Sequence, residues 1–222
     1  MGLLLLMAIF VSIMISPSTQ PKLPYGNILF VNDDFTNDPA NNKFNNIQAA
    51  INNASDGDII YIFEGEYTGN IWINKEVRII GEGTGKVIID GNGRDYAVNI
   101  VKDNVTIENV SIKNGVIAGI GIVIFSKNKN IEIKNCVLHG DGKYGLKILS
   151  SNISIINCTI YDVPTAIFAG ASNISFFDCT IYDVEWRTWL EKSYNCSLLN
   201  MKIHDVENKS IMINSSENID II

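Results

Sequence analysis

The chain repeats one short pattern of apolar and polar positions. The stretch "NIEIKNCVL" begins at Asn130, and similar stretches begin at Asn152 and Asn173. Related phrases start at Asn104, Asn195 and Asn218, so the pattern returns every 21 to 26 residues. Within each copy the second, fourth, seventh and ninth positions are apolar or Cys. This alternation predicts two short β-strands separated by a corner.

The corner between the two strands carries Asn or Asp in every full copy. The corner residues are Asn109, Asn135, Asn157, Asp178 and Asn200. Both residue types tolerate the left-handed backbone region and bond locally to nearby amides. We therefore expect a sharp bend of the backbone at each of these positions.

A third strand precedes most copies of the phrase. These strands begin at Ala97, Gly145, Ala166 and Ser210. The sequence thus has three strands per repeat, a period of about 22 residues and no long amphipathic helix. These features predict an all-β solenoid, namely a single-stranded parallel β-helix in which each coil buries its apolar side against the next.

The N-terminal part of the chain predicts a cap for this solenoid. Ile47, Ala50, Ile51 and Ala54 follow the spacing of a short amphipathic helix. Such a helix would cover the open end of the first coil, where core residues and strand edges would otherwise be exposed. We therefore divide the chain into an N-terminal strand and capping helix (residues 21–68) and β-helix coils (69–222).

The last phrase stops at "NIDII", after supplying only its first strand. We accordingly expect the coils to be truncated at the C-terminus, and either further coils in a longer protein or end-to-end self-association.

The first 20 residues predict export. A 13-residue apolar run from Leu3 to Ile15 fits a signal peptide or an uncleaved membrane anchor. We expect a secreted, periplasmic or cell-surface protein. The formal net charge of −7, with scattered Lys and Arg, argues against a nucleic-acid partner.

Three cysteines occupy the same inward position of consecutive copies. Cys136, Cys158 and Cys179 are expected to form a stack of free, buried thiols, although neighbouring coils are close enough for a disulfide. The state of Cys196 stays open.

Two segments resemble a known group of proteins. The segment "FNNIQAAINNASDGDIIYIFEGEY", followed by "VRIIGEG" and "VIIDG", resembles the opening of right-handed parallel β-helix proteins of the pectate-lyase-like superfamily. The later copies resemble the NosD-type repeat of surface β-helices. The resemblance implies a right-handed coil, but the superfamily contains lyases, hydrolases, esterases, epimerases and non-catalytic adhesins. Motifs of polygalacturonases and pectin methylesterases are not found in the sequence.

The positions directly after the repeated phrase could hold a metal or a catalytic group. His139, Tyr161, Tyr182 and His204 share one position, and Gly140, Asp162, Asp183 and Asp205 share the next. Carboxylates on consecutive coils would repel one another at about 5 Å, which Ca²⁺ could relieve. With Arg187 nearby, such a set would suit a calcium-dependent polysaccharide lyase. The alternative, which we favour, is a turn whose Asp bonds to backbone amides.

The outward side of the third strand is a candidate binding surface. Its expected outward residues are Asn99, Val123, Lys147, Phe168, Leu190 and Met212, and Tyr161, Tyr182 and Trp186 come from the preceding turns. An exposed apolar and aromatic strip usually marks a binding site. In this alignment Glu191 falls on an inward position, which requires either a one-residue shift in register or an unusual buried carboxylate.

The sequence thus leaves two functions open. We favour a non-catalytic, adhesin-like surface domain that binds a polysaccharide or a protein partner and needs no cofactor. The second is the calcium-dependent lyase that uses Asp162, Asp183, Asp205 and Arg187.

Overall fold

The computed structural model describes residues 26–113, 120–125, 129–140, 142–208, 211–214 and 216–221, with backbone only at Trp186 and Arg187. The expected signal peptide or anchor lies outside the described residues. Among the described residues, no helix is both long and apolar enough to cross a membrane.

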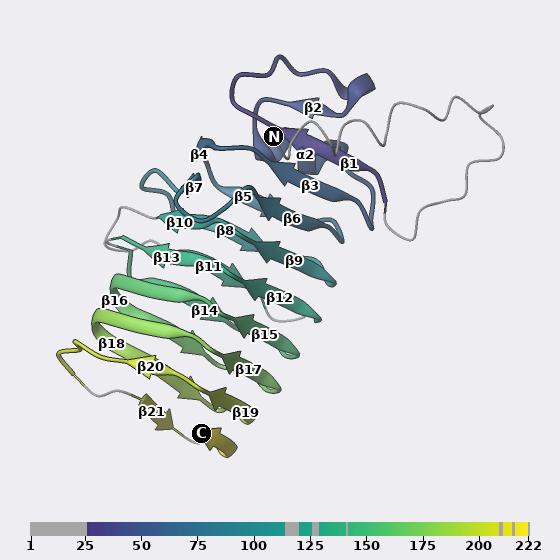
Figure 1. The fold of residues 1–222 in the computed structure, drawn as a ribbon. Coiled ribbons are helices and arrows are strands. Elements are labelled where there is room, and N and C mark those ends of the chain that lie inside the picture. The colour runs from purple at the N-terminus through teal and green to yellow at the C-terminus, as the bar shows by residue number, and fades with distance from the viewer. Residues whose placement is uncertain are drawn as a thin grey trace.

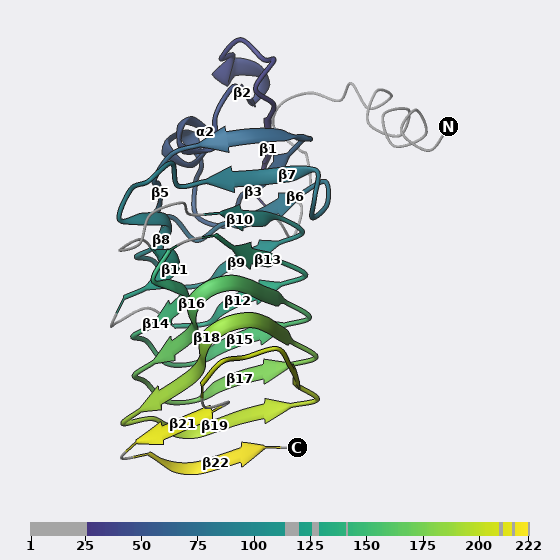
Figure 2. The same ribbon diagram turned by 90° about the vertical axis from the view of Figure 1, so that its left-hand side faces the viewer.

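The described chain winds into a parallel β-helix with three rows of strands (Figures 1 and 2). The first row is a ten-stranded sheet of β2 (Lys43–Phe44), β1 (Ile28–Val31), β3 (Ile59–Ile62), β6 (Arg78–Gly81), β9 (Val105–Glu108), β12 (Ile131–Lys134), β15 (Ile153–Ile156), β17 (Ile174–Phe177), β19 (Tyr194–Leu199) and β22 (Glu217–Ile221). Its strands pair in parallel, about 22 residues apart, which confirms the predicted solenoid.

The second and third rows are joined into one sheet. The second row contains β4 (Gly65–Thr68), β7 (Val87–Asp90), β10 (Ser111–Lys113), β13 (Val137–His139) and β20 (Lys202–Ile203). The third contains β5 (Ile71–Ile73), β8 (Tyr96–Ile100), β11 (Ile120–Ile124), β14 (Tyr144–Ile148) and β21 (Ile211–Asn214). Two long strands, β16 (Thr159–Ala169) and β18 (Thr180–Glu191), pair with both rows and connect them.

The corner residues adopt the left-handed backbone that the sequence predicts. Asn135 and Asn157 have φ of 50° and 49°, and the other corner residues are similar. The first residue of each phrase, such as Asn130 or Asn152, is also left-handed, which the sequence analysis did not anticipate. From β9 to β19, a residue type that accepts positive φ at low cost therefore lies at both ends of each first-row strand.

Asparagine side chains join neighbouring coils along these two edges. Asn157 Nδ2 donates to Asn135 Oδ1 at 2.9 Å at the corner. At the opposite edge Asn173 Nδ2 donates to Asn152 Oδ1 at 3.0 Å, and Asn195 Nδ2 donates to Asn173 Oδ1 at 3.3 Å. These amide ladders fix the spacing of successive coils from outside the core.

The interior is a continuous stack of aliphatic residues with four cysteines among them. Cys136, Cys158, Cys179 and Cys196 are buried free thiols, which confirms the inward stack. A hydrogen bond with Cys136 raises the pKa of Cys158, and burial raises the pKa of Cys196. Because all four thiols are buried, they are inert core residues.

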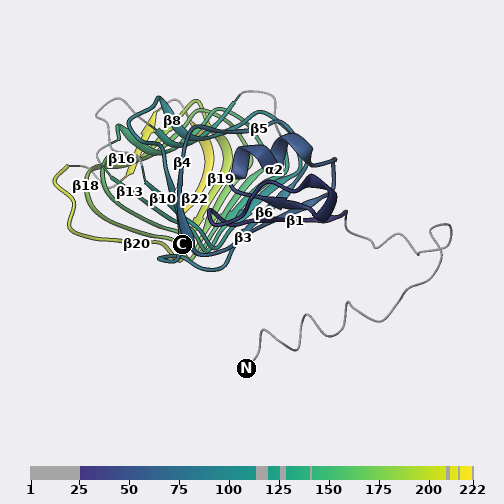
Figure 3. The same cartoon turned by 90° about the horizontal axis from the view of Figure 1, so that it is seen from above.

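The predicted capping helix is present as α2 (Ile47–Asn53), with a 3-10 turn, η1 (Pro39–Asn41), before it. Asn46 accepts a hydrogen bond from the Ala49 amide at 2.8 Å and caps the helix, while Ile47, Ala50 and Ile51 are buried. Figure 3 looks onto this end and shows α2 beside β1 and β5. Strands β3 and β4 already pair with β6 and β7, so the coil begins before residue 69.

Candidate functional site

The third row carries a strip of large side chains on its outer side. Backbone pairing aligns Lys147 with Phe168, Phe168 with Trp189, and Trp189 with Met212. Tyr144 lies beside this column, with its ring centroid 5.7 Å from that of Phe168. We call Tyr144, Lys147, Phe168, Trp189 and Met212 the outer strip; all five are partly exposed.

The structure corrects the register of the predicted strip at Leu190. Leu190 is fully buried and pairs with Ala169, whereas Trp189 takes the outward position opposite Phe168. The pairing advances by 21 residues here (189 − 168 = 21), one fewer than the typical repeat. This register places Leu190 in the core and leaves Glu191 partly exposed at the strand end, which avoids burying a carboxylate.

The strip is confined to the C-terminal half of the row. Asn99 and Val123 point to the same side as Lys147 but are each only 1% exposed. At the far end of the column Trp72 is 48% exposed. The prediction that Asn99 and Val123 belong to an open surface is therefore wrong.

Two lysines lie over the rings of the outer strip. Lys147 Nζ is 5.6 Å from the ring centroid of Tyr144 and 5.9 Å from that of Phe168. Lys143 Nζ is 5.2 Å from the Tyr144 centroid. Neither lysine forms an ion pair with a carboxylate in the part of the chain that the structure describes. Cation–π contact holds both ammonium groups beside the aromatic surface.

The predicted aromatic ladder forms a column of stacked rings at the start of β16 and β18. Successive centroid distances along His139, Tyr161, Tyr182 and His204 are 5.1, 5.0 and 5.3 Å, with interplanar angles of 5° or less. The two tyrosines therefore have both ring faces covered by neighbouring rings. Burial and the charge of Lys113 lower the pKa of His139, while burial raises the pKa of Tyr182.

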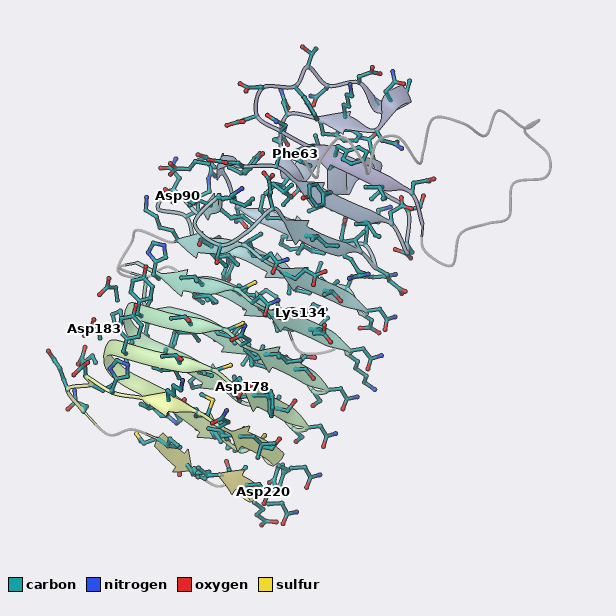
Figure 4. All side chains as sticks on the ribbon, in the orientation of Figure 1. Phe63, Asp90, Lys134, Asp178, Asp183 and Asp220 are labelled. Atoms are coloured by element: carbon teal, nitrogen blue, oxygen red, sulfur yellow. The ribbon has the colours of Figure 1, made fainter. Side chains whose placement is uncertain are left out.

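The aspartates beside the ring column lie where the chain bends between the second and third rows: Asp162 and Asp183 within the long strands β16 and β18, and Asp205 after β20. Asp162, Asp183 and Asp205 have φ of 50°, 49° and 49°, so their backbone is left-handed. Figure 4 labels Asp183 at the outer edge of the molecule. The Asp205 carboxylate is 2.6 Å from Nδ1 of His204. The described residues contain no cluster of three His, Cys, Asp or Glu side chains placed to hold one metal ion. The side chains of the two other candidates, Trp186 and Arg187, lie outside the described residues.

A charged network on the first row was not predicted. Glu108, only 8% exposed, is 2.9 Å from Nη2 of Arg78 and 3.2 Å from Nζ of Lys134. Lys134 also lies 2.9 Å from Glu132, and this hydrogen bond is the main cause that raises the pKa of Lys134. Lys134 is labelled on this row in Figure 4. The network joins β6, β9 and β12 across the outer face.

Comparisons with known proteins agree with this architecture. A family model described as "Right handed beta helix region" matches residues 96–222. Among curated proteins no relative matches the sequence.

Several solved structures share the fold at low sequence identity. The pectate lyase Pel9A is 15% identical with a TM-score of 0.59, and the match covers 79% of this chain and 55% of that one. An alginate lyase from Paenibacillus sp. str. FPU-7 is 15% identical with a TM-score of 0.58, covering 83% and 80%. A pectin methylesterase mutant in complex with hexasaccharide IV is 13% identical with a TM-score of 0.54, covering 82% and 67%. The fold is thus one that polysaccharide-active enzymes also use.

Proposed function

Since the chain belongs to the right-handed β-helix family, we propose that it is an exported domain that binds an acidic polysaccharide along the outer strip without cleaving it. The observation that carries the proposal is the position of Lys147 between two aromatic rings. Its ammonium group lies over Tyr144 and Phe168 and has no carboxylate partner among the described residues. A sugar carboxylate would supply that partner.

The rings of the strip supply the apolar part of the site. Phe168 and Trp189 meet edge to face, with centroids 5.7 Å apart at 67°, so neither ring is stacked face to face on the other. Partly exposed aromatic residues of this kind dominate the affinity of many binding surfaces. Because strands repeat at about 4.8 Å along the row, the strip presents its groups in a line, as an extended polymer requires.

The ring column is less suited to the same task. Both faces of Tyr161 and Tyr182 are already covered, so only ring edges and hydroxyl groups remain for a ligand. The aspartates beside it have the left-handed backbone that the turn interpretation expects, but the described residues show no hydrogen bond from a backbone amide to their carboxylates. We therefore assign ligand binding to the outer strip and a structural role to the column and its turns. Calcium is not part of the proposal.

Binding to polygalacturonate and alginate oligosaccharides, measured by isothermal titration calorimetry, tests the proposal. Phe168→Ala should weaken binding about tenfold, since a central aromatic contact is commonly worth about 1–2 kcal/mol. The matched control is Phe177→Ala on the outer side of β17, where Phe177 is 45% exposed and remote from the strip; it should bind as the native protein does.

A second variant tests the charge. Lys147→Ala should weaken binding and reduce its dependence on ionic strength, whereas Lys147→Arg should restore most of both. Equal affinity of Phe168→Ala and Phe177→Ala would contradict the assignment. If the protein released unsaturated oligosaccharides when calcium was added, it would be a lyase and not a non-catalytic binding domain.

A further inference from the structure

A polar groove lies on the outer face of the first row. Its volume is about 530 Å³, and its lining extends over five strands from β6 to β17. The floor is formed by Thr106, Glu132, Ser154 and Ser175, which pair in this order across the sheet. Asn130 and Asn152 are among the asparagines of one wall. We call this feature the polar groove; it belongs to a different row of strands from the outer strip.

The asparagine wall is held in place before any ligand arrives. Asn130 Nδ2 donates to Asn104 Oδ1 at 3.0 Å, and Asn173 Nδ2 donates to Asn152 Oδ1 at 3.0 Å. Asn173 also accepts a hydrogen bond from Asn195 Nδ2, at 3.3 Å. Each amide has two donors and two acceptor sites, so even an amide bonded on both sides, as Asn173 is, keeps one donor and one acceptor site. Side chains that are already fixed lose little rotamer entropy on binding.

On the C-terminal side of Glu132, the floor repeats a hydroxyl group from coil to coil. Ser175 Oγ donates to Ser154 Oγ at 3.3 Å, and Ser197 follows in the same column on β19. The groove thus presents hydroxyl and amide groups at the strand spacing of about 4.8 Å. A repeating row of weak donors and acceptors suits a ligand whose own hydroxyl groups repeat along its length.

The charges at the groove are neutralised within the protein. Arg78 is paired with Glu108 at 2.9 Å, and Glu132 is paired with Lys134 at 2.9 Å. Among the residues that the structure describes, no other charged side chain lines the groove. A charged ligand would therefore gain no unpaired partner here, and binding must depend on hydrogen bonds.

From this geometry we infer that the polar groove is a second binding site, for an extended neutral oligosaccharide. This site rests on its own residues and is independent of the outer strip. With an acidic polysaccharide bound on the outer strip and a neutral one in the polar groove, a single protein molecule would connect the two.

Titration with cellohexaose and with a linear mannohexaose tests this site. Ser154→Arg fills the floor of the groove from an outward position and should reduce the affinity for the bound hexasaccharide at least about tenfold, the effect of losing two or more hydrogen bonds. Asn152→Gly removes one wall amide while keeping the left-handed backbone, where φ is 61°, and should weaken binding about threefold to tenfold.

The matched control is Ile156→Arg, which places the same side chain on the same strand, two residues on and outside the groove lining. This variant and Phe168→Ala should bind the neutral hexasaccharide as the native protein does, with unchanged circular dichroism in all variants. The inference fails if neither hexasaccharide binds, or if Ser154→Arg binds as tightly as Ile156→Arg. Loss of polygalacturonate binding in Ser154→Arg, with Phe168→Ala unaffected, would overturn both site assignments.

Discussion

Asn157 has a left-handed backbone, so glycine should be better tolerated than alanine at this corner. At an ordinary helical position the order of the two substitutions is the reverse. Asn157 has φ of 49° and donates a hydrogen bond to Asn135 at 2.9 Å. Alanine in the left-handed region costs about 1–2 kcal/mol, and loss of an exposed hydrogen bond adds about 0.5–1 kcal/mol. Asn157→Ala should therefore lower the free energy of unfolding by about 1.5–3 kcal/mol.

Glycine at the same corner avoids the steric part of this cost. Asn157→Gly still loses the ladder bond and pays a backbone-entropy cost of about 0.5–1 kcal/mol. It should thus be more stable than Asn157→Ala by about 0.5–1 kcal/mol. The assay is equilibrium unfolding in urea followed by tryptophan fluorescence and circular dichroism.

Asn52 in α2 provides the matched control. This exposed helical residue accepts a hydrogen bond from Gln48 at 3.0 Å, which both substitutions remove. Because Asn52 is helical, the free energy of unfolding of Asn52→Ala should exceed that of Asn52→Gly by up to about 1 kcal/mol, the reverse of the order at Asn157. If Ala is as stable as Gly at Asn157, positive φ is not what selects asparagine at the corners.

Three further predictions follow from the geometry of the core and the turns. Asp162→Asn should leave stability within about 0.5 kcal/mol, since Asn also accepts φ near 50°, whereas Asp162→Val should lose about 1–2 kcal/mol by urea unfolding. The four cysteines should resist a thiol reagent in the native protein and react fully in denaturant, because all four are buried; fast reaction of native protein would contradict the inward stack. Burial and the charge of Lys113 lower the pKa of His139 below its unfolded value, so the unfolded state takes up the proton first as pH falls. The stability that is present above about pH 6.5 is therefore lost below it. His139→Phe should show a shallower fall of Tm between about pH 7 and 5 than the native protein.

The fold was predictable because the same physical requirement recurs in every coil. Alternating apolar residues define strands, and a left-handed Asn or Asp is needed at each corner, so the pattern survives large variation elsewhere. The cap was predictable for a similar reason, since one short amphipathic stripe precedes the coils. The stacked rings of the column follow directly from in-register parallel pairing of one repeated position.

The outer strip was predicted less well, because coil lengths differ. A spacing of 21 residues between Phe168 and Trp189 moves Leu190 inward, and a later pairing, Trp189 with Met212, advances by 23. A one-residue change reverses the side to which a strand residue points. Alternation also says which side a residue faces but not what covers it, so the burial of Asn99 and Val123 could not be read from the pattern.

The polar groove and the Glu108 network were missed for a different reason. Ser154, Ser175 and the asparagines look like ordinary surface positions of the repeat, and no single copy distinguishes them. Glu108 contacts residues 30 positions before and 26 after it, and one of these contacts is diagonal across the strand pairing. Such contacts depend on side-chain reach across strands rather than on any local motif.

In a solenoid one repeat position recurs on every coil, so the side chains at that position form a line of chemical groups along the surface. Here three outward columns differ in what they leave for a ligand. The ring column covers its own faces, and the outer strip leaves aromatic surface beside a lysine that has no carboxylate partner among the described residues. The polar groove leaves hydroxyl and amide groups beside paired charges. Because all three share the same spacing between coils, spacing alone cannot decide which ligand each one binds. The difference must come from charge and from exposed ring faces, which is why substitutions at Lys147 and Ser154 should affect acidic and neutral ligands separately.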